Sequence, residues 1–102
     1  MPSVRFLIVT TPSRLALETV KKILSMLQQL AVPIIGVIEN MRRSPSSLVK
    51  NQLATFNVPL IGEIDFDDSL EQATGSTNDL LHTPFAADLR ALIRHAQDNH
   101  LL

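Results

Sequence analysis

The sequence contains no cysteine, no tryptophan and no tyrosine. Without cysteine the chain has no disulfide framework, no thiolate metal site and no cysteine nucleophile. Its four phenylalanines are the only aromatic rings, which leaves few platforms on which the bases of single-stranded nucleic acid could stack. Phe6 and Phe56 each lie in an apolar pattern, and we expect them to fill the core instead.

Charge and hydropathy exclude further classes of protein. Nine Lys and Arg residues balance ten Asp and Glu residues, for a formal charge of −1, so there is no basic footprint for nucleic acid or an anionic membrane. The apolar run near the start, Phe6–Val9, is too short for a signal peptide or a membrane span. We expect one folded cytoplasmic domain over residues 1–102, without an internal boundary, a nucleic-acid partner or a membrane span.

Three short runs rich in β-branched residues predict strands. They cover Val4–Thr10, Pro33–Ile38 and Pro59–Ile64, and the first is apolar almost throughout, as expected for a strand covered on both faces. Proline at the first position of the other two is tolerated, because a missing N–H costs little there.

Helical patterns fill the stretches between and after these strands. Apolar residues recur at helical spacing from Ser13 to Ala31 and predict one long amphipathic helix. Capping residues predict where the later helices start: Ser46 or Ser47, Asp68 with Glu71 three residues on, and Thr83 followed by Pro84.

The alternation of strands and helices predicts an α/β fold with parallel strands in sequential order and helices on both faces of the sheet. Three parallel strands are few for such a three-layer fold. The run Val4–Thr10 would leave a strongly apolar strand at an open edge, which favours pairing with another strand. The sequence therefore predicts half of a larger sheet.

Ligands of open parallel sheets bind beyond the carboxyl ends of the strands, where three segments are candidates: Thr10–Ser13, Glu39–Arg43 and Asp65–Asp68. The hydroxyls of Thr10 and Thr11 in the first either approach an anion or cap the long helix. Asn40 in the second either reads the edge of a base or forms a turn. The acidic third segment either holds a cation or starts a helix.

The remaining charged and titratable groups give weaker signals. We expect Arg42, Arg43 and Lys50 to form a solvated basic loop, and the three histidines have no spacing typical of metal ligands.

The order of these segments is more specific than any one of them. Phe6-Leu-Ile-Val-Thr-Thr-Pro12, a long helix, Gly36-Val-Ile-Glu-Asn-Met41 and then Gly62-Glu-Ile-Asp65 resembles the Mrp/ApbC/MinD family of P-loop ATPases from Phe6 to about Ile93. The resemblance implies that Asn40 contacts the adenine base and that the loop around Asp65 closes over it. It also implies that Thr11 and Pro12 lie near the nucleotide.

Several parts of the family pattern are absent. The phosphate-binding element G-x-x-x-x-G-K-S/T occurs nowhere in the sequence, and the family's Mg²⁺-binding and water-positioning acidic residues precede this region. Asp65 stands where the family has proline. The paired cysteines of Mrp-type members are replaced by Arg42-Arg43-Ser44-Pro45, so we expect no bridging iron–sulfur cluster.

The leading hypothesis is therefore the base-side, C-terminal portion of an ATP-binding P-loop domain, with no catalytic residue and no metal ligand of its own. ATP or ADP with Mg²⁺ is implied through the full-length family, and we expect none tightly bound to this chain. The partner is then an N-terminal P-loop half, or a second copy that forms a dimer through Val4–Thr10.

Two other hypotheses stay open. One is a free-standing α/β protein-interaction module without a nucleotide. The other is a receiver-like phosphoacceptor, which ranks last because it needs an acidic pair where this chain has Thr10 and Thr11.

Overall fold

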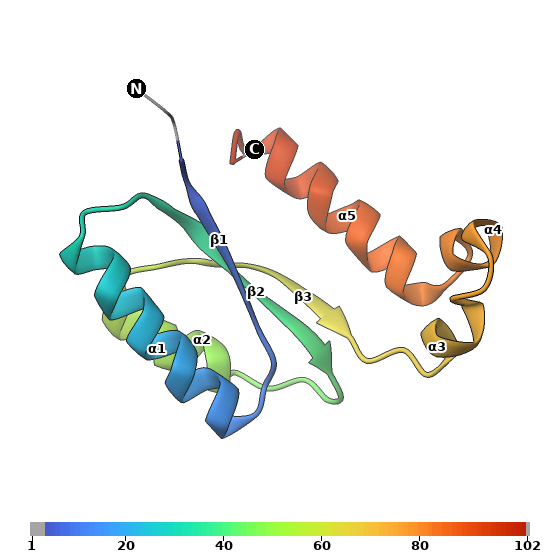
Figure 1. Ribbon diagram of the computed structural model, residues 1–102, viewed down its shortest axis with the longest axis horizontal. Helices are drawn as coiled ribbons and strands as arrows, with labels where there is room; N and C mark the ends of the chain where they lie inside the picture. The colour runs from blue at the N-terminus through green and yellow to red at the C-terminus, as the bar shows by residue number, and fades with distance from the viewer. Residues whose placement is uncertain (1–3, 102) are drawn as a thin grey trace.

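The computed structural model describes residues 4–101, and these form a parallel sheet with helices on both faces (Figure 1). In chain order the elements are β1 (Phe6–Thr10), α1 (Arg14–Gln29), β2 (Ile34–Arg42), α2 (Leu48–Leu53), the 3-10 turn η1 (Ala54–Phe56), β3 (Leu60–Asp65), α3 (Ser69–Ala73), α4 (Thr77–Leu81) and α5 (Pro84–Asp98). The strands pair in parallel in the order β1-β2-β3. The predicted fold class and strand order are confirmed.

Two separate apolar clusters hold the three layers together. On one face, α1 and α2 pack their buried leucines and valines on Ile8 of β1 and Val37 of β2. On the other face, Leu92 of α5 packs on Ile38 and Ile64. Figure 1 shows α1 and α2 on one side of the sheet and α5 on the other. Each face of the sheet thus has its own small core.

The two long helices start near their predicted positions, and α5 also has its predicted cap, Thr83. The Ser13 hydroxyl accepts a hydrogen bond from the Ala16 amide at 3.1 Å, and α1 follows. The Thr83 hydroxyl accepts one from the Ala86 amide at 3.1 Å, with proline at the first position of α5. These bonds satisfy N–H groups that have no partner inside the helix.

The shorter helices differ in which residue caps them. Ser46, rather than the N-cap residue Ser47, accepts from the Leu48 amide at 3.1 Å. Asp68 makes no side-chain cap for α3, and the carboxylate of Asp67 binds the Ser69 amide at 2.9 Å instead. The predicted starts are right to within a residue, but the neighbouring side chain supplies the bond.

The second strand is longer than predicted, because it continues beyond Ile38 to Arg42. Glu39 pairs with Glu63 and Arg42 pairs with Asp65, so three steps along β2 match two along β3. Met41 takes up the extra residue with φ 60°, as in a β-bulge. The candidate segment Glu39–Arg43 is therefore mostly strand rather than loop.

The outer edge of β1 has no strand beside it within residues 4–101. Val9 is 55% exposed, and Phe6 is 41% exposed, so the expectation that Phe6 fills the core was wrong because the strand lies at the edge of the sheet. Phe56 does pack against the core under α1. Among the described residues, no helix has both the length and the apolar character needed to cross a bilayer.

Candidate functional site

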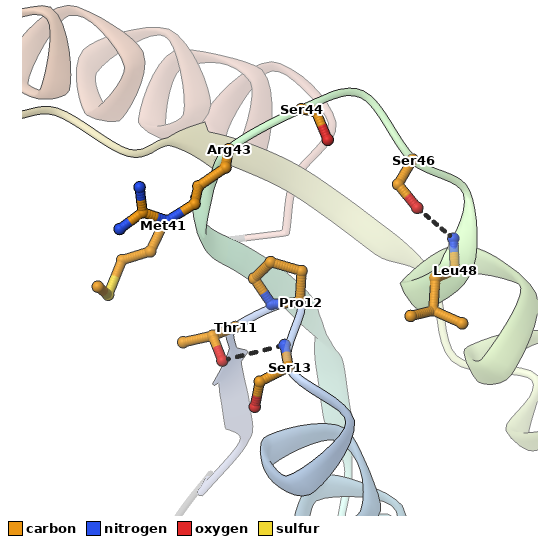
Figure 2. Close-up of a pocket in the computed structure, with 8 residues that line it drawn as sticks. All are labelled: Thr11, Pro12, Ser13, Met41, Arg43, Ser44, Ser46 and Leu48. Atoms are coloured by element: carbon orange, nitrogen blue, oxygen red, sulfur yellow. Dashed lines mark hydrogen bonds between the residues drawn. The ribbon is translucent and has the colours of Figure 1, made fainter.

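Among the cavities at the carboxyl ends of the strands, two carry the residues singled out from the sequence. The wider one, about 490 Å³, lies between the start of α1 and the loop that follows β2 (Figure 2). It is lined by Thr11, Pro12, Ser13, Met41, Arg43, Ser44, Ser46 and Leu48. The smaller one, about 200 Å³, is lined by Asn40, Met41, Asp65, Phe66, Asp67, Leu70 and Phe85.

The four residues that the sequence singles out fall into two pairs. Asn40 and Asp65 line the smaller cavity, whereas Thr11 and Pro12 line the wider one. Met41 lines both cavities and is the residue at which they adjoin. The two pairs are therefore neighbours in one region at the carboxyl edge of the sheet, as parallel pairing requires.

Thr11 and Pro12 occupy the short connection from β1 to α1. The Thr11 hydroxyl accepts a hydrogen bond from the Ser13 amide at 3.4 Å, and Figure 2 shows this contact on the wall of the wider cavity. Ser13 in turn caps α1. The expectation that Thr10 or Thr11 caps α1 was therefore wrong by two residues, because Ser13 is the residue that accepts from the first turn. The N-terminal end of this 16-residue helix lies beside the cavity.

The side chain of Asn40 is fixed by its own backbone. Its Oδ1 accepts a hydrogen bond from the Met41 amide at 2.9 Å, at the bulge where Met41 has positive φ. Its Nδ2 makes no hydrogen bond to another described residue. In Asn40 the amide oxygen therefore fixes the local turn, while the amide nitrogen stays available as a donor among the described residues. Asn40 lines the smaller cavity.

The remaining walls of the smaller cavity are mostly apolar: Phe66 falls in the predicted segment Asp65–Asp68, whereas Leu70 and Phe85 were not predicted from the sequence. Phe66 follows β3, Leu70 lies in α3 and Phe85 begins α5. Asp67 is the residue in the sequence that could have indicated these walls, because one carboxylate can accept hydrogen bonds from the first turns of two helices and so bring them together. Asp67 accepts from the Ser69 amide at 2.9 Å and hydroxyl at 2.6 Å, and from the Phe85 amide at 2.9 Å.

These bonds to Asp67 have an electrostatic consequence. The Ser69 hydroxyl, and then the Phe85 amide, stabilise the carboxylate and hold the pKa of Asp67 below its usual value. The acidic segment was expected either to hold a cation or to start a helix. Asp67 has the second role, because it caps the start of α3 and its hydrogen bond to the Phe85 amide fixes the start of α5.

Asp65 is committed to an ion pair. The Arg42 Nε lies 2.8 Å from its Oδ1, and Arg42 Nη1 pairs with Glu63. The hydrogen bond that the Arg42 Nε–H donates to the Asp65 carboxylate is the main reason that the pKa of Arg42 is raised. Arg43 stacks its guanidinium over the Phe66 ring, 4.0 Å from the centroid. The expectation of a solvated basic loop was therefore wrong for Arg42, which ends β2 and is paired, whereas Arg43 does lie in the exposed loop after β2.

Glu39 is the one buried carboxylate of this region. Its side chain is 1% exposed, and neither oxygen has a hydrogen-bond partner among the described residues. Burial raises the pKa of Glu39, and the negative charge of Glu63 raises it further. Within residues 4–101 no group of three or more His, Cys, Asp and Glu side chains has an arrangement that could hold a metal ion.

Comparison with known proteins assigns the family. The family model that matches residues 1–98 is described as ParA, the NUBPL iron-transfer P-loop NTPases. The chain is a member of this P-loop NTPase family. That membership confirms the resemblance to Mrp/ApbC/MinD-type ATPases, and the observed parallel sheet agrees with a partial P-loop NTPase fold.

Two curated relatives are both named cytosolic Fe–S cluster assembly factor Nubp1 homolog. The one from Drosophila willistoni is 29% identical over 113 aligned residues, which cover 95% of this chain and 36% of the relative. The one from Drosophila ananassae is 32% identical over 92 residues, which cover 76% of this chain and 30% of the relative. This chain thus spans about a third of the length of these relatives.

The expectation of no iron–sulfur cluster is contradicted by these matches, since the family is described by iron transfer and both relatives by cluster assembly. The expectation rested on Arg42–Pro45 standing in place of the paired cysteines. This chain spans only about a third of its relatives' length, so its sequence does not show which residues of a full-length protein would bind the cluster. Iron–sulfur clusters are held mainly by cysteine thiolates. Because the sequence has no cysteine, these 102 residues do not themselves supply a thiolate set.

Proposed function

We propose that this chain forms the base-side part of the nucleotide site of an iron-transfer P-loop NTPase. The observation that carries the proposal is the Asn40 amide, which Met41 holds in place with Nδ2 free on the wall of a largely apolar cavity. Asparagine recognises adenine by donating to a ring nitrogen and accepting from the exocyclic amine. Oδ1 retains a second lone pair for that purpose.

The apolar walls support a flat aromatic ligand. Phe66 and Phe85 line the cavity, and stacking of a base on an aromatic side chain contributes about 1–3 kcal/mol. Arg43 lies against Phe66, so one wall is already held in position by a cation. In this proposal Asp65 acts through its position at the end of β3 beside the base, with its carboxylate bound to Arg42.

The phosphates of the nucleotide need groups from outside this sequence. Thr11, Pro12 and the start of α1 would lie near them on the wider cavity, but the backbone loop and lysine of a P-loop are absent from the 102 residues. We therefore place a segment that carries the P-loop beside β1, whose outer edge is free in the described residues. A second copy pairing through β1 is the other occupant of that edge.

The iron–sulfur cluster enters as cargo. The relatives are named for cytosolic cluster assembly, and we assign this chain to the same process in the cytoplasm. The thiolates would come from a segment or partner outside these residues, and the nucleotide site would serve that assembly. The match to an NTPase family favours this function over a free-standing interaction module.

Photolabelling with an azido-substituted adenine nucleotide tests the base site. The label should attach within residues 65–70 or near Phe85, and excess ATP should prevent it. Asn40→Ala should lower labelling several-fold, while the matched variant Asn78→Ala, on α4 and away from both cavities, should label like the wild type. Labelling that ignores both ATP and Asn40→Ala would overturn the base assignment.

A further inference from the structure

Three hydroxyl residues of this chain are followed by proline, and the structure distinguishes them. Thr83 is 6% exposed, and its hydroxyl donates to the Leu80 carbonyl at 2.8 Å and accepts from the Ala86 amide. The Thr11 hydroxyl accepts from Ser13. Ser44 is exposed, and its hydroxyl makes no hydrogen bond to another described residue. Of the three hydroxyls, that of Ser44 is thus the one that is exposed and not engaged by another described residue.

The backbone around Ser44 is also free to change shape. Residues 43–47 connect β2 to α2 without regular structure, and every one of them is exposed. Pro45 has no N–H to donate and disfavours helical conformation at Ser44. The chain at Ser44–Pro45 can therefore be drawn into an extended form without breaking a sheet or helix bond.

We propose that Ser44 is a phosphorylation site for a proline-directed protein kinase. In the reaction the Ser44 Oγ forms a bond to the γ-phosphorus of ATP, the bond from that phosphorus to the bridging oxygen breaks, and ADP leaves. The hydroxyl proton passes to the carboxylate base of the kinase.

The neighbouring arginines favour recognition through proline. A kinase that reads basic residues before the serine needs their side chains, but Arg42 is bound to Glu63 and Asp65. Arg43 lies on the Phe66 ring. Pro45 is exposed and makes no comparable contact, so it is the residue that a kinase can recognise in the folded chain.

A phosphoryl group at Ser44 would alter the site itself. Ser44 lines the wider cavity (Figure 2) and also an adjoining cavity of about 300 Å³ that contains both arginines and Asp65. The group adds about −1.5 to −2 charges on the same wall as Arg43. It would attract Arg43 and repel an anion at the Thr11 side of the wider cavity. This regulatory consequence rests on the proposed nucleotide site, whereas the phosphorylation does not.

Intact-mass measurement of the folded chain tests the site. We would incubate the purified chain with a mitogen-activated protein kinase and Mg-ATP, and expect one phosphoryl group, mapped to Ser44 by peptide fragmentation. Ser44→Ala and Pro45→Ala should each abolish it, and the matched variant Ser46→Ala should retain it. Heat-unfolded chain should gain a further group at Thr83, because that hydroxyl then becomes accessible.

Three results would overturn the proposal. They are no incorporation while a control peptide is phosphorylated, incorporation that survives Ser44→Ala, and incorporation that survives Pro45→Ala, which would indicate a kinase that reads the arginines. The regulatory step has its own measurement: phosphorylation should weaken binding of ATP by about tenfold at low salt and by less at high salt. Equal affinity of both forms would refute that step, and a failure of either form to bind ATP would refute the nucleotide site but leave the modification standing.

Discussion

Glu39 and Asp67 are carboxylates with opposite environments. Glu39 is enclosed without a hydrogen-bond donor among the described residues, whereas Asp67 receives three hydrogen bonds at the surface. Burial raises the pKa of the first, and hydrogen bonds lower the pKa of the second. Their contributions to folding must therefore depend on pH in opposite directions.

We predict that Glu39→Gln stabilises the chain at neutral pH. Because the pKa of Glu39 is higher in the folded state, the folded form binds the proton more tightly, and stability falls as pH rises from the usual glutamate value to the raised one. The penalty is therefore complete only at pH values above the raised pKa. Glutamine keeps the shape without the charge and should raise the free energy of unfolding by about 1 kcal/mol or more.

Urea unfolding of Glu39→Gln and wild type over a pH series measures this effect. The difference should shrink at pH values below the usual glutamate pKa, where Glu39 is protonated in both states. Glu71→Gln, at an exposed glutamate on α3, is the control and should not stabilise the chain. A less stable Glu39→Gln protein at neutral pH would show that the carboxylate has a partner.

Asp67→Asn should remove part of the acid sensitivity of folding. The lowered pKa means that the stabilisation by Asp67 is complete above the usual aspartate value and is lost as pH falls through the folded-state value. The variant should be less stable at neutral pH and show a flatter acid limb in thermal unfolding. Asp68→Asn is the control, because Asp68 makes no side-chain cap. Identical acid limbs for wild type and Asp67→Asn would contradict the prediction.

At the scale of elements, α5 depends on a glycine in β3. A Cβ atom on Gly62 would lie 2.2 Å from Leu92 Cδ1 and 2.7 Å from its Cγ, so the helix approaches the strand closely at this point. Leu92 belongs to the small core on that face.

Gly62→Ala should therefore destabilise the chain by about 1–3 kcal/mol through overpacking against Leu92. Gly75→Ala is the matched control, because its added Cβ would meet nothing within 4 Å and its φ is not positive; it should be neutral or slightly stabilising. The midpoint of urea unfolding measures both variants. Equal midpoints would show that α5 shifts freely on the sheet.

The elements predicted best from the sequence were those with local signals. The three strands and the two long helices follow from apolar periodicity, and the start of α5 follows from its cap at Thr83, which acts within four residues of the chain. The strand order follows from the alternation of elements. These features need no knowledge of distant residues, and the family match agrees with them.

The features that the sequence did not predict depend on contacts between distant residues. The extension of β2 to Arg42 depends on its pairing with Asp65. The arginine contacts span more than twenty residues of chain, from Arg42 to Asp65 and from Arg43 to Phe66. The apolar walls at Phe66 and Phe85 come together because Asp67 binds the start of α5. Residues this far apart in the chain leave no local sequence pattern from which their contact could be predicted.

At the scale of the whole molecule, β1 is the exposed edge. Val9 is 55% exposed beside an unpaired strand edge, and an edge of this kind favours strand pairing. Without a segment that carries the P-loop, we predict that purified chains associate through β1. A two-fold contact of this kind closes on itself, so a dimer is the expected species.

Sedimentation velocity over a concentration series measures this association. Val9→Lys should raise the dissociation constant at least about tenfold, because a buried lysine at the interface lacks a partner. Leu15→Lys on α1, at a residue that is 81% exposed, should behave like the wild type. A single monomeric species at every concentration, with the chain still folded, would contradict association through β1.

An amide NMR titration of the chain with adenosine monophosphate locates the base site residue by residue. We predict that the amides that shift are those around the smaller cavity, at Asn40, Met41, Phe66 and Phe85. Asn40→Ala should abolish the pattern, and guanosine monophosphate should produce smaller shifts. Shifts that are absent, that lie away from this cavity, or that persist unchanged in Asn40→Ala would contradict the assignment of a base site to this chain.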